Sequence, residues 1–318
     1  MSSPMPFGSL SAPTPDSPEQ DPQQSLFDRA IILSLTMSCL GTRRKVSTTS
    51  IETDADKALL HVSKDILDSP ELAAIHHLDG SIRKYLKTRG LPSPLKHGCY
   101  LLPIDLIEPV EQRLSELFAE RETAVGAFMT AYPAKIEDVQ RRLGPLFDTT
   151  DYPPVGELRA AFEASFQYLT FGAPTALQGV SRTLYEREKD KAIQRIAAVE
   201  DEITQVLRFS LKELVDHMVD RLQPTSDGKP KVFRNTLISN LTEFLDTFKA
   251  RNLTNDQDLE ALTHQARAIL AGADAETLRS SADTRAHVHQ QMATVKHALD
   301  ALVITKPTRK FNFANDET

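Results

Sequence analysis

A chain of 318 residues with 40% apolar and 25% charged residues has the composition of an ordinary folded protein, which excludes disorder throughout. The formal net charge of -7 argues against a protein that grips nucleic acid with its whole surface. Cys39 and Cys99 are too few for a disulfide framework, so reduced thiols and a cytoplasmic location are expected. We predict no membrane segment, because the apolar run Ala30 to Leu40 is too short to cross a bilayer.

The chain begins with a leader and a strand. Residues 1–25 are rich in Pro, Ser, Gln and acidic residues, which predicts a disordered leader. From Ala30 to Cys39 apolar residues alternate with small polar ones, the pattern of a half-buried strand. Gly41 breaks the pattern, and 42–45 is expected to be a basic turn. A second strand is expected at Cys99 to Leu102, and it should pair with the first, because neither strand satisfies its backbone groups alone.

Helices are expected between these two strands. Asp54 or Asp56 can cap a helix whose apolar face runs to Leu67, and Ser69 followed by Pro70 opens another. Gly80 is expected to separate that helix from a short one at 82–86. Residues 26–104 are therefore predicted to form a small α/β part.

Residues 105–303 are predicted to form an elongated helical body, followed by a polar tail at 304–318. The expected helix breaks are Tyr132-Pro133 and Gly144-Pro145, and a further helix carries Val155, Leu158, Phe162, Phe166 and Leu169. The longest segment free of Gly and Pro, 182–222, predicts a single helix of about 60 Å. A break at 223–231 should fold the next helix, with Val232 to Phe248, back antiparallel along it.

The long helix carries a sustained apolar stripe. Its central members are Ile196, Ile203, Leu207, Leu214 and Met218, spaced for one helical face. The intramolecular hairpin is the favoured interpretation of this stripe. Pairing with a second copy as a coiled coil is the alternative, so a homodimer stays open.

Chemistry-bearing motifs are sparse. Glycines are too scattered for a phosphate-cradling loop. Two pairs, Glu213 with His217 and Glu260 with His264, have the spacing of half a metal site, but solvated polar faces are the favoured interpretation. Adjacent His76 and His77 could serve as acid and base, although no nucleophile motif accompanies them. We therefore predict no catalytic residues, no metal and no cofactor.

One stretch is basic without an intervening acid. It spans 81–98 and includes a constrained turn at 90–94, and Tyr85 and Tyr100 lie nearby to stack on bases. The alternative interpretation is a solvated helix face. The candidate nucleic-acid-binding residues are Arg43, Arg44, Lys45, Arg83, Lys84, Lys87, Arg89 and Lys96.

Three strings carry a family resemblance: DKALLHVSKDILDSPEL at 56–72, LPSPL at 91–95 and GCYLLP at 98–103. With Tyr132-Pro133 and Asp151-Tyr152-Pro153, they resemble an uncharacterised family of phage, prophage and mobile-element proteins, over most of the chain after the leader. Members of that family are often encoded near MoxR-type AAA ATPases and von Willebrand factor A-like proteins. The resemblance implies a genetic neighbourhood and brings no catalytic residues.

Together these patterns predict a mainly α protein. The expected architecture is an elongated helical body with a long antiparallel helical hairpin, plus a small N-terminal α/β part with a two-stranded sheet. The favoured function is a non-enzymatic adaptor or assembly protein of a phage or mobile element, with a protein partner such as an AAA ATPase in a bacterial cytoplasm. Nucleic-acid binding by the basic stretch is the alternative.

Overall fold

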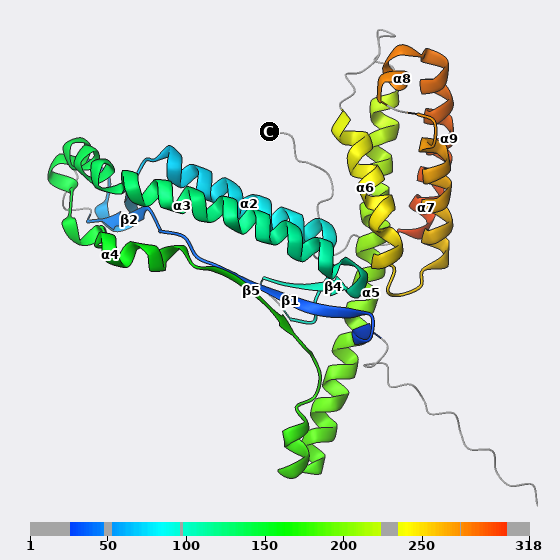
Figure 1. Ribbon diagram of the computed structural model, residues 1–318, viewed down its shortest axis with the longest axis horizontal. Coiled ribbons are helices and arrows are strands. Elements are labelled where there is room, and N and C mark those ends of the chain that lie inside the picture. The colour runs from blue at the N-terminus through cyan, green and yellow to red at the C-terminus, as the bar shows by residue number, and fades with distance from the viewer. Residues whose placement is uncertain (1–25, 48–52, 96–97, 224–234, 274, 304–318) are drawn as a thin grey trace, which may run out of the picture.

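The computed structural model describes residues 26–47, 53–95, 98–223, 235–273 and 275–303 (Figure 1). Within these residues the protein is mainly α-helical, with long helices and small antiparallel sheets, which confirms the predicted fold class. Figure 1 shows two helical parts that extend in different directions from a central sheet. We call them the hairpin arm and the bundle.

The central sheet has three antiparallel strands in the order β4-β1-β5. Strand β1 (Ala30–Met37) pairs with β4 (Cys99–Pro103), with Leu33 opposite Tyr100, so the predicted pairing is confirmed. Strand β5 (Ala164–Leu169) covers the other edge of β1, where the sequence predicted a helix. That prediction was wrong because Phe166 and Tyr168 alternate with Ser165 and Gln167, which is a period of two.

A separate two-stranded ribbon follows β1. Strand β2 (Arg43–Val46) pairs with β3 (Val62–Asp65) through Val46 opposite Val62. The basic turn and the helix predicted for these residues were therefore both wrong. Asp56 does act as a cap, but only of the single turn η2 (Lys57–Leu59). The Ala58 amide of this turn donates to the Asp56 carboxylate.

The hairpin arm consists of two long antiparallel helices together with this ribbon. Helix α2 (Pro70–Arg89) starts at the predicted cap, Ser69, and α3 (Ile107–Leu143) returns along it. The predicted breaks at Gly80 and Pro133 were wrong. Both residues lie on exposed faces, and each helix stays continuous because its opposite face packs against the core. The buried residues are Ile75 and Ile82 in α2 and Tyr132 and Val139 in α3.

The short turn η3 (Ile104–Leu106) precedes α3. Between α3 and the next long helix lie strand β5 and the short elements η4 (Gly144–Leu146), η5 (Thr149–Asp151), α4 (Val155–Leu158), η6 (Arg159–Phe162) and η7 (Thr175–Gly179). The arm covers one face of the sheet, where Leu33, Ile82, Tyr100 and Leu114 belong to one core.

Helix α5 (Arg182–Leu222) is the long helix that the sequence predicts, with the same bounds and a Ser181 cap. Its middle section shares a second core with the opposite face of the sheet, through Ile32 and Leu101. Beyond the sheet, α5 continues into the bundle (Figure 1).

The bundle joins the C-terminal half of α5 to α6 (Asn235–Arg251), α7 (Gln257–Leu270), the short α8 (Ala275–Ser280) and α9 (Ala282–Leu302). Helix α6 runs antiparallel to α5, which confirms the predicted helical hairpin (Figure 1). Helix α9 is a second antiparallel partner, because Lys212 pairs with Asp300 while Asp216 pairs with Lys296 at 2.6 Å.

Candidate functional site

The hairpin arm and the bundle meet where α2 ends, α3 begins and α6 passes both. Helix α2 stops at Gly90, whose amide donates to the Leu86 carbonyl. A Cβ at Gly90 would lie 2.9 Å from the Tyr100 Cβ, so only glycine lets the helix end so close to β4. Leu91 then bonds to Leu101 through both backbone groups, which fixes the end of α2 on the sheet.

Three arginines join the two parts at this point. Arg89 of α2 pairs with Glu243 of α6 at 3.0 Å. Arg251 at the end of α6 donates to the Thr88 carbonyl at 3.3 Å, in the last turn of α2. Arg29, just before β1, donates to the Leu253 carbonyl at 3.1 Å and the Asn252 carbonyl at 3.3 Å in the α6–α7 loop. Cations favour the terminal carbonyls of a helix, so the contact of Arg251 with the Thr88 carbonyl also stabilises the end of α2.

Arg251 is fully buried and contributes a rigid contact. Its guanidinium lies 4.7 Å from the centre of the Phe244 ring and donates to the Phe244 carbonyl at 3.2 Å. Burial, with the nearby charge of Arg89, lowers the pKa of Arg251 to about 9, although Glu243 opposes the shift. A buried group of this kind is held in one geometry by its hydrogen bonds, which favours a single angle between arm and bundle.

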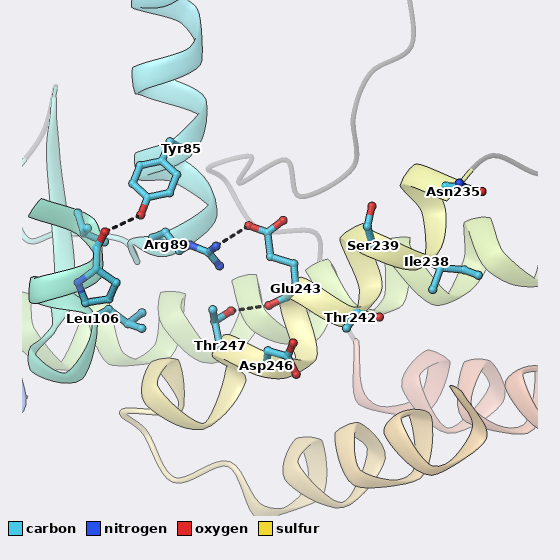
Figure 2. A pocket seen from close by; sticks show the side chains of 12 residues that line it. Tyr85, Arg89, Leu106, Asn235, Ile238, Ser239, Thr242, Glu243, Asp246 and Thr247 are labelled. Carbon is cyan, nitrogen blue, oxygen red and sulfur yellow. Dashed lines mark hydrogen bonds and ion pairs between the residues drawn. The ribbon is translucent and has the colours of Figure 1, made fainter. Parts of the chain in front are cut away.

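A groove of about 770 Å³ runs along this junction, and we call it the junction groove (Figure 2). Apolar side chains of Leu106, Val110 and Ile238 line it from both parts. The carboxylates of Glu243 and Asp246 lie on its α6 side. A mostly apolar groove with few charged groups suits the binding of a side chain or a peptide segment.

Several polar side chains of the junction groove already bond to the backbone or to a charged partner. The Tyr85 hydroxyl donates to the Pro109 carbonyl at 3.3 Å, and burial raises the pKa of Tyr85 above its ordinary value, which keeps the donor protonated. Ser239 donates to the Thr236 carbonyl, and Thr247 to the Glu243 carbonyl. These contacts occupy the polar groups in structure and favour a binding surface over a catalytic pocket.

The predicted basic cluster is divided between the two ends of the hairpin arm. Arg44 and Lys64 both pair with Asp151, at 3.6 and 2.7 Å, and Lys64 also reaches the Leu146 carbonyl just after α3. Arg43 pairs with Asp65 across the ribbon, and Lys45 is exposed beside it. The acids therefore offset much of the charge at this end.

The remaining members of the cluster belong to α2. Arg83, Lys84 and Lys87 are exposed on this helix, whereas Arg89 lies in the junction groove. Lys96 lies outside the described residues. The structure thus brings three of the predicted cations to one surface of α2 and separates them from those on β2.

The predicted stripe of α5 faces the chain's own core. All five residues are buried: Ile196, Ile203, Leu207, Leu214 and Met218. Contacts from the sheet, α6 and α9 cover this stripe, which favours the intramolecular interpretation over a coiled coil through the same face.

The histidines and cysteines do not gather into a site. Among residues 26–303 as far as the structure describes them, no group of three or more His, Cys, Asp or Glu side chains could hold a metal ion. The Nε2 atom of His76 lies 3.1 Å from the Cys39 Sγ, a pair that the sequence did not predict. Burial and the Asp79 charge raise the pKa of Cys39, which keeps the thiol protonated and poorly nucleophilic.

Arg29, Glu243 and Arg251 are site residues that the sequence analysis missed. For Arg251 a signal existed, because it continues the apolar phase of α6, in which Leu241, Phe244 and Phe248 are buried. Arg29 and Glu243 carry no such signal, since their contacts join elements far apart in the sequence.

The comparisons with known proteins give no family for this chain. No protein-family model, no curated protein and no solved structure matches it. The resemblance to phage and mobile-element proteins therefore stays a prediction. No helix in the described part of the chain has both the length and the apolar character needed to cross a membrane.

Proposed function

We propose that this protein is a non-enzymatic adaptor or assembly component whose junction groove receives a segment of a protein partner. The observation that supports the proposal is the groove itself. It has a volume of about 770 Å³, lies between two helical parts and is mostly apolar, and several of its polar groups bond within the protein. Such a groove offers buried contact area without a set of reactive groups. The family resemblance suggests an AAA ATPase of a phage or mobile element as the partner, in a bacterial cytoplasm.

The fixed angle between the hairpin arm and the bundle supports this proposal. Arg89 and Arg251 hold the hairpin arm and the bundle at one angle, and Arg29 joins the central sheet to the bundle. A partner in the groove therefore touches both helical parts at once. A binding surface that is ordered beforehand loses less conformational entropy on association. The long helices then present separate outer surfaces for further assembly contacts.

The test is parallel purification of tagged parent and variant chains from the native host after induction of the element. Ser239→Arg places a long charged side chain in the groove while sparing the buried face of α6. Val180→Arg is the matched control, because Val180 is 77% exposed just before α5. A protein recovered with the parent and the control but lost with Ser239→Arg supports the proposal, and equal recovery with all three contradicts it.

Nucleic-acid binding is a second candidate, favoured by the shared exposed surface of Arg83, Lys84 and Lys87 on α2. Such binding should weaken steeply with salt, because cations on the protein replace condensed counterions. The test is an anisotropy titration at low salt against single- and double-stranded DNA, with all three residues changed to Glu. No binding by the parent, or equal binding by the triple variant, removes this candidate.

A further inference from the structure

The junction groove has an apolar floor with acidic residues around it. The carboxylates of Glu243 and Asp246 are each paired with an arginine, Arg89 and Arg267, at 3.0 and 3.2 Å. Their side chains are nevertheless 42% and 59% exposed, so they face water and can share a further cation. Asp105 and Glu108 are exposed beside Leu106 at the other side of the groove. The groove thus suits an apolar segment that carries positive charge.

The C-terminal segment of this chain has that chemistry. Residues 304–318 carry Phe311 and Phe313 directly after Arg309 and Lys310, with Lys306 before them. Two aromatic side chains bury a large apolar area at little entropic cost. The three cations precede the acids Asp316 and Glu317, so the aromatic part of the segment is locally basic.

The last described residues before this segment lie at the junction end of the bundle. The Leu302 carbonyl accepts from Arg208, which pairs with Asp256 at the start of α7. Asp256 closely follows the α6–α7 loop, whose carbonyls bind Arg29 at the junction. The chain therefore departs from Val303 at the junction end of the bundle.

The extended segment is longer than the groove. Phe311 follows Val303 by eight positions, which an extended chain spans with about 27 Å. The α6 side of the groove, from Thr247 to Asn235, is about 18 Å long at the rise of an α-helix. A tethered segment also has a high effective concentration, so weak contacts are enough to hold it.

We propose that residues 304–318 dock in the junction groove of their own chain, with Phe311 and Phe313 on its apolar floor and Arg309 and Lys310 toward Glu243 and Asp246. The docked segment lies on the same surface that we propose for a partner. This extends the proposed function, but the test below uses no partner. Its failure therefore leaves the adaptor proposal standing.

The chain contains no tryptophan, so Phe311→Trp introduces a single indole as a probe. In the full-length variant we expect blue-shifted emission and several-fold weaker acrylamide quenching than in a synthetic peptide of residues 304–318 with the same substitution. Adding Thr242→Lys, on the exposed α6 side of the groove, should raise quenching toward the peptide value by repelling Arg309 and Lys310. Thr242→Glu is the matched control and should keep the indole protected.

Three results would overturn the proposal. Quenching equal to that of the free peptide means that the segment does not dock. Protection that neither Thr242 substitution changes means that it docks elsewhere, such as on the exposed surface of α5. Protection lost on dilution means that it enters a second copy. Circular dichroism of each variant checks the fold, and Ser239→Lys replaces Thr242→Lys if the latter loses helix.

Discussion

The Arg121 Nε atom donates to the Asp79 Oδ1 atom at 2.6 Å, and this ion pair between α3 and α2 lies almost wholly inside the protein. Arg121 is 2% exposed and Asp79 is 4% exposed. The same guanidinium donates to the Phe162 and Ser38 carbonyls, both at 2.8 Å. One side chain therefore connects both helices of the hairpin arm to η6 and to the end of β1.

Removing this arginine should destabilise the protein strongly. Arg121→Ala leaves the Asp79 carboxylate buried without its cation and two carbonyls without a donor, and we expect a loss of about 3 to 5 kcal/mol in the free energy of unfolding. The double variant Arg121→Met with Asp79→Leu keeps the volume without burying a charge and should recover part of that loss. Urea unfolding followed by circular dichroism measures both. A loss below about 1 kcal/mol in the single variant would mean that water reaches the pair.

Pro133 should limit the stability of α3. It lies inside the helix on an exposed surface and has no N–H to donate to the Met129 carbonyl. Pro133→Ala restores that donor and should raise the free energy of unfolding by about 1 to 3 kcal/mol, partly offset by a more flexible unfolded chain. Ala134→Gly, at the next exposed position, is the control and should lower stability by about 1 kcal/mol. A lower melting temperature for Pro133→Ala would show that Pro133 is needed for the packing of Tyr132 and Val139.

The sequence was most informative where one period dominates a long segment. Helix α5 was predicted with its true ends because its apolar stripe continues without Gly or Pro, and Ser181 caps it. The pairing of β1 with β4 was predicted because neither strand can satisfy its backbone hydrogen bonds alone. In these elements the local sequence pattern and the tertiary packing favour the same structure, so they can be predicted from the sequence.

Short segments were predicted less well because packing decides their conformation. Val155, Leu158 and Phe162 suggested a helical stripe that continued to Phe166. They belong to α4 and η6, whereas Phe166 pairs with Leu35 in the sheet. The junction groove was unpredictable for a related reason. Its two sides come from α2 and α6, and their contact at Arg89 and Glu243 depends on tertiary geometry that no local pattern encodes.

A charge on the buried stripe of α5 should disrupt the bundle. Ile203 is 0% exposed and Leu214 is 1% exposed, so Ile203→Asp or Leu214→Asp buries a carboxylate among apolar side chains. We expect a loss of at least about 3 kcal/mol, or no cooperative unfolding. Ala197→Asp, on the exposed face of the same helix, should cost less than about 1 kcal/mol. Equal melting temperatures for the parent and both stripe variants would show that the stripe faces solvent.

The Arg208–Asp256 pair should make bundle stability depend on acid pH. Burial opposes ionisation of Asp256, yet donation from Arg208 and from the Leu259 amide, together with the Arg208 charge, holds its pKa below the ordinary value. The unfolded chain then binds a proton at higher pH than the folded chain does. The stabilisation is therefore complete above the unfolded pKa, near 3.9, and is lost as the pH falls through the folded pKa.

Asp256→Asn isolates this charge, because asparagine can still accept from the Leu259 amide as the cap of α7. We expect the variant to lose about 1.5 to 3 kcal/mol at pH 7, the range for a hydrogen bond to a charged group. The difference between parent and variant should narrow below about pH 4, as the parent carboxylate also becomes neutral. Asp283→Asn, exposed in the first turn of α9, is the control and should show a much smaller loss. The measurement is urea unfolding of all three chains between pH 7 and pH 2. If the difference in unfolding free energy between parent and Asp256→Asn stays constant over that range, hydrogen-bond geometry and not the charge provides the stabilisation.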